Sequence, residues 1–364
     1  MKRTLLAMLL LLLYVGCGGG NSGGNTGGTG GGTGGTSAAT TINVFEGNLF
    51  PTPSQVLQFS KTASGSVSPI STITGPADVL FEEMAVDASG NVYVGGKMAS
   101  PPSYPQTGIE ILVYGPEASG TATPVRTLNG QAVWPAQTTM RILSMAVDAA
   151  QNLYVATDEN AVPGSNPPST TTLWQGVAVF SSTANGSAAP TRDIAGNATE
   201  IQAISQIAVD STGNIYVASV LGLGPSSILI FNSSATGNMP PTNSLASSDT
   251  DFYQVKGVAV DTAGNIYVSA LSEATPPAVG RPSVLEFSTG STGNATPIRT
   301  ISGSATMLDT GALGNIAVDS AGNIYVLSGA TILKFPSSAS GNVPPTAAIT
   351  SSSFYQSGSS IAVQ

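Results

Sequence analysis

Two apolar strings alternate along the chain and divide it into repeats. The first runs through small and apolar residues to Asp-x-x-Gly-Asn (Gln replaces Gly in one copy) and then back to apolar residues. Its five copies lie at 84–94, 145–155, 207–217, 258–268 and 316–326. The second joins two apolar runs through a segment rich in Ser, Gly and Pro. Its six copies lie at 56–73, 111–128, 177–194, 228–245, 284–301 and 332–349. This regular alternation predicts one supersecondary unit repeated along the chain.

Each repeat predicts four short β-strands, which we name A to D in chain order. In the last copy they fall at 316–319, 323–326, 332–335 and 346–349. The Asp-x-x-Gly-Asn segment predicts a tight hairpin between A and B, because Asp folds back on the backbone and Gly accepts a left-handed conformation. Strands A and B are almost wholly apolar, whereas D carries polar residues between apolar ends. This gradient places A and B inside and D at the outer edge of each sheet.

The pattern predicts an all-β fold, a six-bladed β-propeller of four-stranded antiparallel blades. Six C–D strings are present but only five complete A–B strings. The missing pair is split between the two ends of the domain, with residues 42–45 as strand B and 361–364 as strand A. We therefore expect pairing of the N- and C-terminal strands to close the ring, which removes open sheet edges.

The A–B string resembles NHL-type repeats and related bacterial propeller repeats, in which a "VD..GN.YV" motif marks the inner hairpin. The resemblance covers essentially all of residues 41–364. It implies the propeller architecture and no particular activity, because propellers host many functions.

The first residues resemble a bacterial lipoprotein signal. Lys2 and Arg3 precede an apolar run that ends at Cys17, the single cysteine of the chain. We expect residues 1–16 to be a signal peptide, 17–41 to be a lipidated Cys17 with a flexible Gly-rich tether, and 42–364 to be the propeller. The expected location is the bacterial cell envelope, at the outer membrane or cell surface, with the membrane as a partner. The alternative is a simple secretory signal, with Cys17 incidental.

Composition narrows the possible functions. The chain has 11 Lys and Arg against 20 Asp and Glu, so its charge argues against a nucleic-acid partner. It has no His, which removes the commonest general base and metal ligand. We therefore expect no Ser-His or Cys-His catalytic pair, and we expect no cofactor.

Loop variation indicates which face of the ring is used. The A–B and C–D loops are uniform and share one face, whereas the B–C loops and D–A connections vary and share the other. Variable loops on a rigid scaffold are where binding sites are usually built. The candidate binding residues on this face, for a protein, peptide or glycan ligand, are Tyr104, Trp134, Trp174, Phe252, Tyr253, Phe354 and Tyr355. The alternative is that these aromatic side chains plug the channel mouth or cover the tops of the blades.

Acidic residues on the same face have two interpretations. Glu82, Glu83, Asp158, Glu159, Asp249 and Asp251 are expected to be solvated surface acids rather than Ca²⁺ ligands. The competing hypothesis is a Ca²⁺- or Mg²⁺-dependent enzyme that resembles propeller lactonases, with Glu83, Asp251 and Asp309 around the ion. The once-per-repeat acids Asp87, Asp148, Asp210, Asp261 and Asp319 are expected to be structural turn residues.

The favoured function is a non-enzymatic binding or scaffold module on the envelope, acting through the variable loops. A structural envelope protein that docks a larger complex is the third possibility. Gln151 occupies the turn position that is Gly in the other copies, so we expect either local strain or an altered turn there, and a gain in stability in Gln151→Gly.

Overall fold

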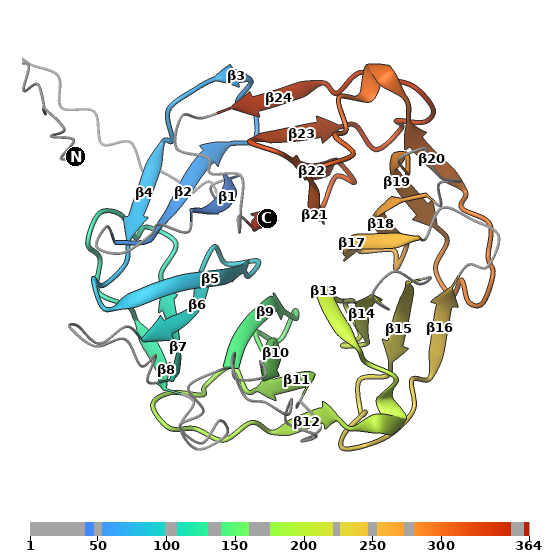
Figure 1. Cartoon of the computed structure of the whole chain (residues 1–364). Coiled ribbons are helices and arrows are strands. Elements are labelled where there is room, and N and C mark those ends of the chain that lie inside the picture. Colours follow the sequence, from blue (N-terminus) through green and yellow to red (C-terminus); the bar gives the residue numbers. More distant parts are fainter. Residues whose placement is uncertain are drawn as a thin grey trace, which may run out of the picture. The chain divides into compact units, whose positions relative to one another are not determined.

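The repeats form six β-sheets arranged around a central axis, as Figure 1 shows. This computed structural model describes residues 41–46, 53–98, 108–129, 140–159, 175–220, 226–246, 253–272, 280–350 and 360–363. All of them lie in one compact unit, Ala38–Gln364. The described regular structure is β-sheet apart from two short 3-10 helices, η2 (Asn197–Thr199) and η3 (Ser304–Thr306).

Each sheet is one blade, and its strands lie in the order A to D. Blade 1 contains β25 (Ile361–Val363), β1 (Thr41–Glu46), β2 (Gln55–Ser60) and β4 (Ser71–Thr74). Blade 2 contains β5 (Val79–Val86), β6 (Val92–Met98), β7 (Ile109–Tyr114) and β8 (Arg126–Asn129). Blade 3 contains β9 (Met140–Val147), β10 (Leu153–Glu159), β11 (Gln175–Phe180) and β12 (Arg192–Ala195).

The second half of the ring follows the same order. Blade 4 contains β13 (Ala203–Val209), β14 (Ile215–Val220), β15 (Ser227–Phe231) and β16 (Asn243–Ala246). Blade 5 contains β17 (Gln254–Val260), β18 (Ile266–Leu271), β19 (Pro282–Phe287) and β20 (Arg299–Ser302). Blade 6 contains β21 (Leu313–Val318), β22 (Ile324–Ser328), β23 (Thr331–Phe335) and β24 (Ala347–Thr350), with β3 (Gly65–Ser66) of blade 1 added at its edge.

The predicted closure by the chain ends is confirmed. Strand β1 pairs antiparallel with β25, with Ile42 opposite Val363 and Val44 opposite Ile361. The other side of β1 pairs with β2, so the two ends of the domain complete one blade. Each innermost strand contacts the innermost strand of both neighbouring blades. The all-β, six-bladed architecture expected from the repeats is therefore present.

One hydrophobic cluster fills each of the six junctions between blades. In five of them a Tyr from strand B of one blade shares the cluster with a Phe from strand C of the next, as with Tyr154 and Phe231. The remaining junction, between blades 1 and 2, uses Val56, Phe81 and Tyr114 instead. These aromatic side chains are among the largest fully buried groups in the protein. Burial of one such side chain contributes about 1.5–3 kcal/mol, so each junction stabilises the ring by several times the thermal energy.

A backbone link also joins every blade to the next. The Gly of each C–D loop forms a parallel bridge with strand D of the preceding blade, from Ile73 with Gly120 around to Ile349 with Gly65. Gly120 N donates to Thr72 O at 2.7 Å, and Thr74 N donates to Gly120 O at 2.7 Å. All six bridging glycines have positive φ, between 57° and 80°. This conformation favours glycine, which explains why every copy of the C–D string carries one here.

Gln151 adopts the strained turn conformation that its position predicts, with φ of 62°. Its side chain also makes contacts that a glycine would lack. Gln151 Nε2 donates to Asp87 Oδ2 at 3.0 Å and lies 3.3 Å from Ser89 Oγ, so it links the A–B turns of blades 2 and 3. The expected gain from glycine is therefore offset by lost hydrogen bonds.

Deleting residues 361–364 tests the closure. The deletion removes the buried Ile361 and exposes the edge of β1, so we expect the thermal midpoint to fall by about 5 °C or more. Calorimetry of the full chain, the deletion and a control that lacks only Gln364 measures the effect. If the deletion has the same thermal midpoint as the full chain, the pairing of β1 with β25 does not stabilise the ring.

Two substitutions of Gln151 separate strain from bonding. Gln151→Ala keeps the strain and loses the side-chain bonds, whereas Gln151→Gly loses both. We expect the free energy of unfolding of the Gly variant to exceed that of the Ala variant by about 1 kcal/mol, measured by urea denaturation. Equal stabilities would mean that the turn relaxes without glycine.

Candidate functional site

The repeated Asp residues organise the A–B turns. Asp87 Oδ1 accepts from Ser89 N and Asn91 N, both at 2.9 Å, while Oδ2 accepts from Asn91 Nδ2 at 2.8 Å and Tyr93 Oη at 3.2 Å. Asp148, Asp210, Asp261 and Asp319 make the same set of bonds in their own blades. Each carboxylate thus ties its turn to the Tyr of strand B, and the geometry explains the spacing of the motif.

A cation extends this arrangement to the next blade at four junctions. Arg126 Nη2 donates to Tyr93 Oη at 3.2 Å, and its Nη1 donates to the carbonyls of Ser182 and Ala184 in the C–D loop of blade 3. Arg192 likewise donates to Tyr154 Oη at 3.3 Å and to Ala235 O at 2.9 Å. Arg299 donates to Ser337 O in the next blade and forms an ion pair with Glu286 of its own blade.

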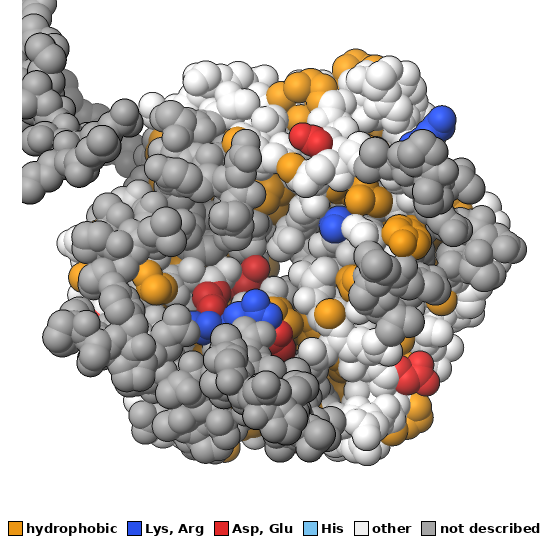
Figure 2. Space-filling model, viewed as in Figure 1, with side chains coloured by type: hydrophobic (Ala, Val, Ile, Leu, Met, Phe, Trp, Pro, Cys, Tyr) orange, Lys and Arg blue, Asp and Glu red, His pale blue; other side chains and the backbone are white. Residues whose placement is uncertain are grey.

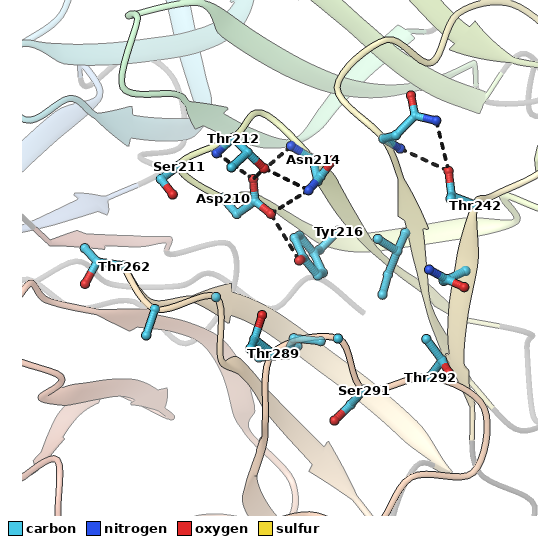
Figure 3. A pocket seen from close by; sticks show the side chains of 17 residues that line it. Asp210, Ser211, Thr212, Asn214, Tyr216, Thr242, Thr262, Thr289, Ser291 and Thr292 are labelled. Atoms are coloured by element: carbon cyan, nitrogen blue, oxygen red, sulfur yellow. Dashed lines mark hydrogen bonds between the residues drawn. The ribbon is translucent and has the colours of Figure 1, made fainter.

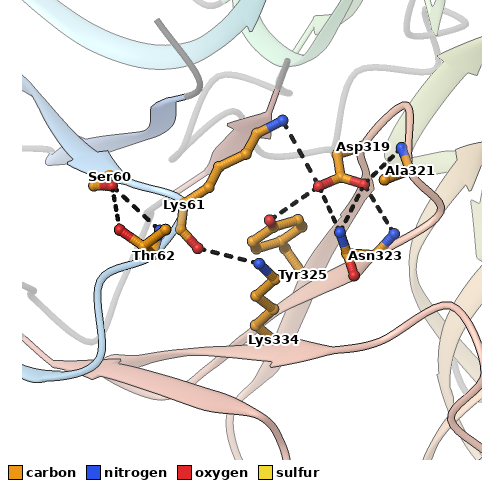
Figure 4. A network of polar contacts seen from close by, with 8 residues as sticks. All are labelled: Ser60, Lys61, Thr62, Asp319, Ala321, Asn323, Tyr325 and Lys334. Atoms are coloured by element: carbon orange, nitrogen blue, oxygen red, sulfur yellow. Dashed lines mark hydrogen bonds and ion pairs between the residues drawn. The ribbon is translucent and has the colours of Figure 1, made fainter.

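The fourth cation comes from strand C. Lys334 Nζ lies 5.4 Å from the ring centre of Tyr325 and donates to Lys61 O at 3.1 Å, while Lys61 Nζ lies 3.7 Å from Asp319 Oδ2 (Figure 4). Burial and the neighbouring Asp raise the pKa of Tyr93 and Tyr154 to about 12, so these hydroxyls stay neutral. The whole arrangement is a structural connection between blades.

A different group of polar residues lines the central channel. A cavity of about 160 Å³ is bounded by the innermost strands of all six blades. In five of the six blades the residue just before the buried A-strand core lines this cavity, and all five are polar: Glu83, Ser144, Gln206, Asn315 and Ser360. Register shifts in β5, β9, β13, β17 and β21 lie next to these positions. Such bulges change the direction of a side chain, which accounts for polar residues along an otherwise apolar strand.

Gln206 crosses the channel from blade 4. Its Oε1 accepts from Val258 N and from Ile316 N, both at 3.2 Å, and its Nε2 donates to Ile316 O at 3.0 Å. The sixth position of the ring is Gly257, where an added Cβ would lie 2.3 Å from Gln206 Oε1. Glycine in blade 5 therefore makes room for this side chain, which joins three blades across the axis.

Glu83 is the one ionisable side chain among the channel-facing polar residues. Burial raises its pKa from 4.5 to about 8; Glu82 acts in the same direction, whereas Ser360 and Met84 N–H oppose it. The Ser360 hydroxyl is buried without a hydrogen bond of standard geometry in the described part of the chain. Glu83 is thus mainly a neutral carboxylic acid at pH 7, able both to donate and to accept a hydrogen bond.

The opening of the channel on the variable-loop face carries a cluster of four charged residues, which we call the mouth cluster. Lys97 Nζ lies 3.1 Å from Glu82 Oε1, and Glu82 Oε2 accepts from Ile142 N at 2.8 Å. Arg141 pairs with Asp158 through two bonds of 3.1 and 2.6 Å. Figure 2 shows acidic and basic side chains gathered beside the central hollow, over β5 and β9. The cluster places opposite charges next to the neutral Glu83.

The acids of this face differ from the sequence expectation. Glu82, Glu83 and Asp158 were expected to be solvated, but Asp158 is 7% exposed and burial raises the pKa of both Glu82 and Glu83. The reason is the bulge in β5, which turns this acidic pair toward the channel. The one signal in the sequence is a polar residue just before the buried A-strand core, which five of the six copies carry.

Most of the predicted aromatic site lies outside the described residues. Tyr253 is described: it is half-buried, and its carbonyl accepts from Ser226 Oγ at 3.3 Å. The other candidates lie outside the described residues: Tyr104, Trp134, Trp174, Phe252, Phe354 and Tyr355. Cys17 also lies outside them. Their roles remain predictions.

The acids of the metal hypothesis are not brought together in the described residues. Glu83 faces the channel, whereas Asp309 is exposed and its Oδ1 accepts from Gly311 N at 2.8 Å. Asp251 is not described. Within the described ranges, no group of three or more His, Cys, Asp and Glu side chains could hold a metal ion. The same part of the chain contains no helix long and apolar enough to cross a membrane.

Comparison with known proteins identifies the fold and no family. No protein-family model matches the chain, and no curated protein matches it in sequence. A crystal structure of a protein of unknown function from Bacteroides caccae superposes with a TM-score of 0.55 at 9% identity, covering 89% of this chain and 98% of that one.

Two further solved structures superpose less closely. The major Malassezia sympodialis allergen Mala s 1 has a TM-score of 0.46 at 13% identity, with 78% of each chain covered. A luciferin-regenerating enzyme has a TM-score of 0.46 at 14% identity, with 80% of this chain and 86% of that one covered. Of the three, the Bacteroides caccae structure is similar enough to support the fold, and at 9% identity it supports the fold alone.

The raised pKa of Glu83 predicts a dependence of stability on pH. An acid whose pKa rises on folding contributes most below its unfolded pKa, and this contribution is lost as pH rises through the folded value. The free energy of unfolding should therefore fall between about pH 4.5 and 8, and Glu83→Gln should remove that part of the slope. Urea denaturation of both proteins across this range measures the difference, which isolates Glu83 from Glu82 and the other acids. Parallel curves would contradict the assignment.

Proposed function

We propose that the chain is a lipid-anchored protein of the bacterial cell envelope and acts as a non-enzymatic binding or scaffold module. The charged leader, the apolar run and the placement of the single Cys17 support the anchor. The Gly-rich segment after Cys17 supports a tether that holds the propeller away from the lipid. The ring itself supports a scaffold role, because its six junctions make it a rigid platform.

The mouth cluster is the observation that favours the variable-loop face as the binding face. Arg141 has a side chain 43% exposed, yet two bonds to the buried Asp158 fix its guanidinium. A cation held in place before binding loses little conformational entropy when a partner arrives. The opposite face presents repeated, nearly identical turns. The proposed ligand is a protein, peptide or glycan that meets the mouth cluster and the surrounding variable loops.

The anchor is tested in bacterial cells that express the full chain. We expect incorporation of a labelled fatty acid and recovery in the membrane fraction, and Cys17→Ser should lose the label. Label retained in Cys17→Ser would overturn lipidation at Cys17. A simple secretory signal instead predicts an unlabelled chain in the soluble envelope fraction.

The binding face is tested in the same cells by photo-cross-linking. A cross-linkable residue replaces the exposed Arg281 next to the B–C loop, and a matched one replaces the exposed Ser320 in an A–B turn. We expect cross-linked partners from position 281, and their loss when Arg141→Glu is added. Partners captured only from position 320, or unaffected by Arg141→Glu, would contradict the proposed face.

A further inference from the structure

One junction of the ring lacks the cation that its neighbours possess. Arg126, Arg192 and Arg299 occupy the same register position in strand D of blades 2, 3 and 5. In blade 4 this position is Asn243, opposite Ile230 of strand C. Ile230 in turn occupies the position of Lys334, which supplies the cation in blade 6. Neither residue can carry a positive charge, so the junction between blades 4 and 5 retains the Asp and Tyr without their partner.

The remaining components of the connection are all present there. Asp210 Oδ2 accepts from Tyr216 Oη at 3.2 Å, as in the other blades. In the described residues Tyr216 has no counterpart of the Arg126 or Lys334 contacts over the rings of Tyr93 and Tyr325. The junction between blades 1 and 2 is different, because Asn43 replaces the Tyr there and accepts from Gln58 Nε2 at 2.9 Å.

A cavity of about 370 Å³ lies at this position, lined by Asp210, Tyr216, Asn243, Thr289 and Ser291 among others (Figure 3). Thr289 and Ser291 occupy the loop positions of Ser182 and Ala184, whose carbonyls accept from Arg126. The groove between blades 3 and 4 has a similar volume, about 400 Å³, but Arg192 is among the residues that line it. The blade 4–5 cavity therefore offers the acceptor set of the other junctions without their internal cation.

The electrostatics of the cavity favour a positive charge. Asp210 is the one charged side chain among its lining residues. Burial would raise the pKa of Asp210, but bonds from Thr212 and Asn214 outweigh it and hold the pKa below its usual value. The carboxylate is thus ionised at neutral pH, and it lies at the hydroxyl end of Tyr216. A cation over a Tyr ring is attracted by the negative face of the ring, and more strongly where water is excluded.

We propose that the groove between blades 4 and 5 binds a guanidinium group, as an arginine side chain of a peptide or protein partner or as free arginine. A planar guanidinium donates in several directions at once, as Arg126 does to Tyr93 Oη and two loop carbonyls. An ammonium has a different donor geometry, and the one internal lysine approaches from the neighbouring strand C. This site lies on the uniform-turn face, so it is independent of the proposed function at the variable loops.

The proposal is tested by titrating the full chain and following amide signals by NMR. The probes are N-methylguanidinium, arginine amide, an Arg-containing tripeptide and the matched Lys tripeptide, each against NaCl of equal ionic strength. We expect saturable shifts around Tyr216 and Ser291 with a Kd on the order of 1 mM for the free cations. Tighter binding of the Arg tripeptide identifies a partner side chain as the source, and equal binding identifies the free compound. Equal binding of the Lys tripeptide, or equal shifts with NaCl, overturns the proposal.

Two substitutions test the proposal further, one that should remove the binding site and one that should create a second site. Asn243→Arg should fill the groove with the chain's own guanidinium and abolish the shifts, whereas the matched neutral Asn243→Gln should keep them. Arg192→Asn should lower the thermal midpoint and create a second site, and millimolar methylguanidinium should restore part of the lost midpoint. Unchanged binding in Asn243→Arg, or a lowered midpoint in Arg192→Asn that NaCl restores equally, contradicts the assignment. Arg192→Asn is expected to gain a binding site, so the test still works if Asn243→Arg does not fold normally.

Discussion

The structure depends on the burial of each blade against its neighbours. A single four-stranded sheet of this sequence has two apolar faces, and each of the six clusters is shared by two adjacent blades. No blade can bury both faces alone, so the ring is stable only when every junction is formed. Blade 1 satisfies this requirement only when β1, at one end of the domain, pairs with β25 at the other. The loops, the mouth cluster and the groove between blades 4 and 5 keep their positions only while the ring is closed.

The junctions combine three layers that reinforce one another. Aromatic side chains fill the interior, glycine bridges join the backbones, and cations connect the turn Tyr to the next loop. The third layer varies from blade to blade, because one position of strand D is Arg in blades 2, 3 and 5 and Asn in blade 4, whereas blade 6 uses Lys334 of strand C. Variation of this kind leaves the fold intact while changing what each groove can accept. The channel also varies from blade to blade. Gly257 has no side chain, and Gln206 of the neighbouring blade occupies the space beside it.

The repeat pattern predicted the fold almost completely, including the blade count, the strand order and the closure. It did so because alternation and turn residues are local properties that recur in register. The environment of Glu83 was not predictable, because it depends on a bulge in β5 and on the convergence of six strands from distant parts of the chain. The reach of Gln206 to Ile316 spans 110 positions and leaves no trace in local periodicity. The aromatic residues of the variable loops have no repeat to support them, so their role stays a prediction.

The seam between β1 and β25 has a consequence for how the protein is made. Ile42 meets Val363, a contact between nearly opposite ends of the domain, so it adds strongly to the mean sequence separation that slows folding. Ribosomes deliver β1 first and β25 last. Blades 2 to 6 can each complete their sheets as they emerge, whereas blade 1 holds an open edge until β25 has been made. Until then the nascent chain carries one unpaired strand edge, which a chaperone or a second copy could bind.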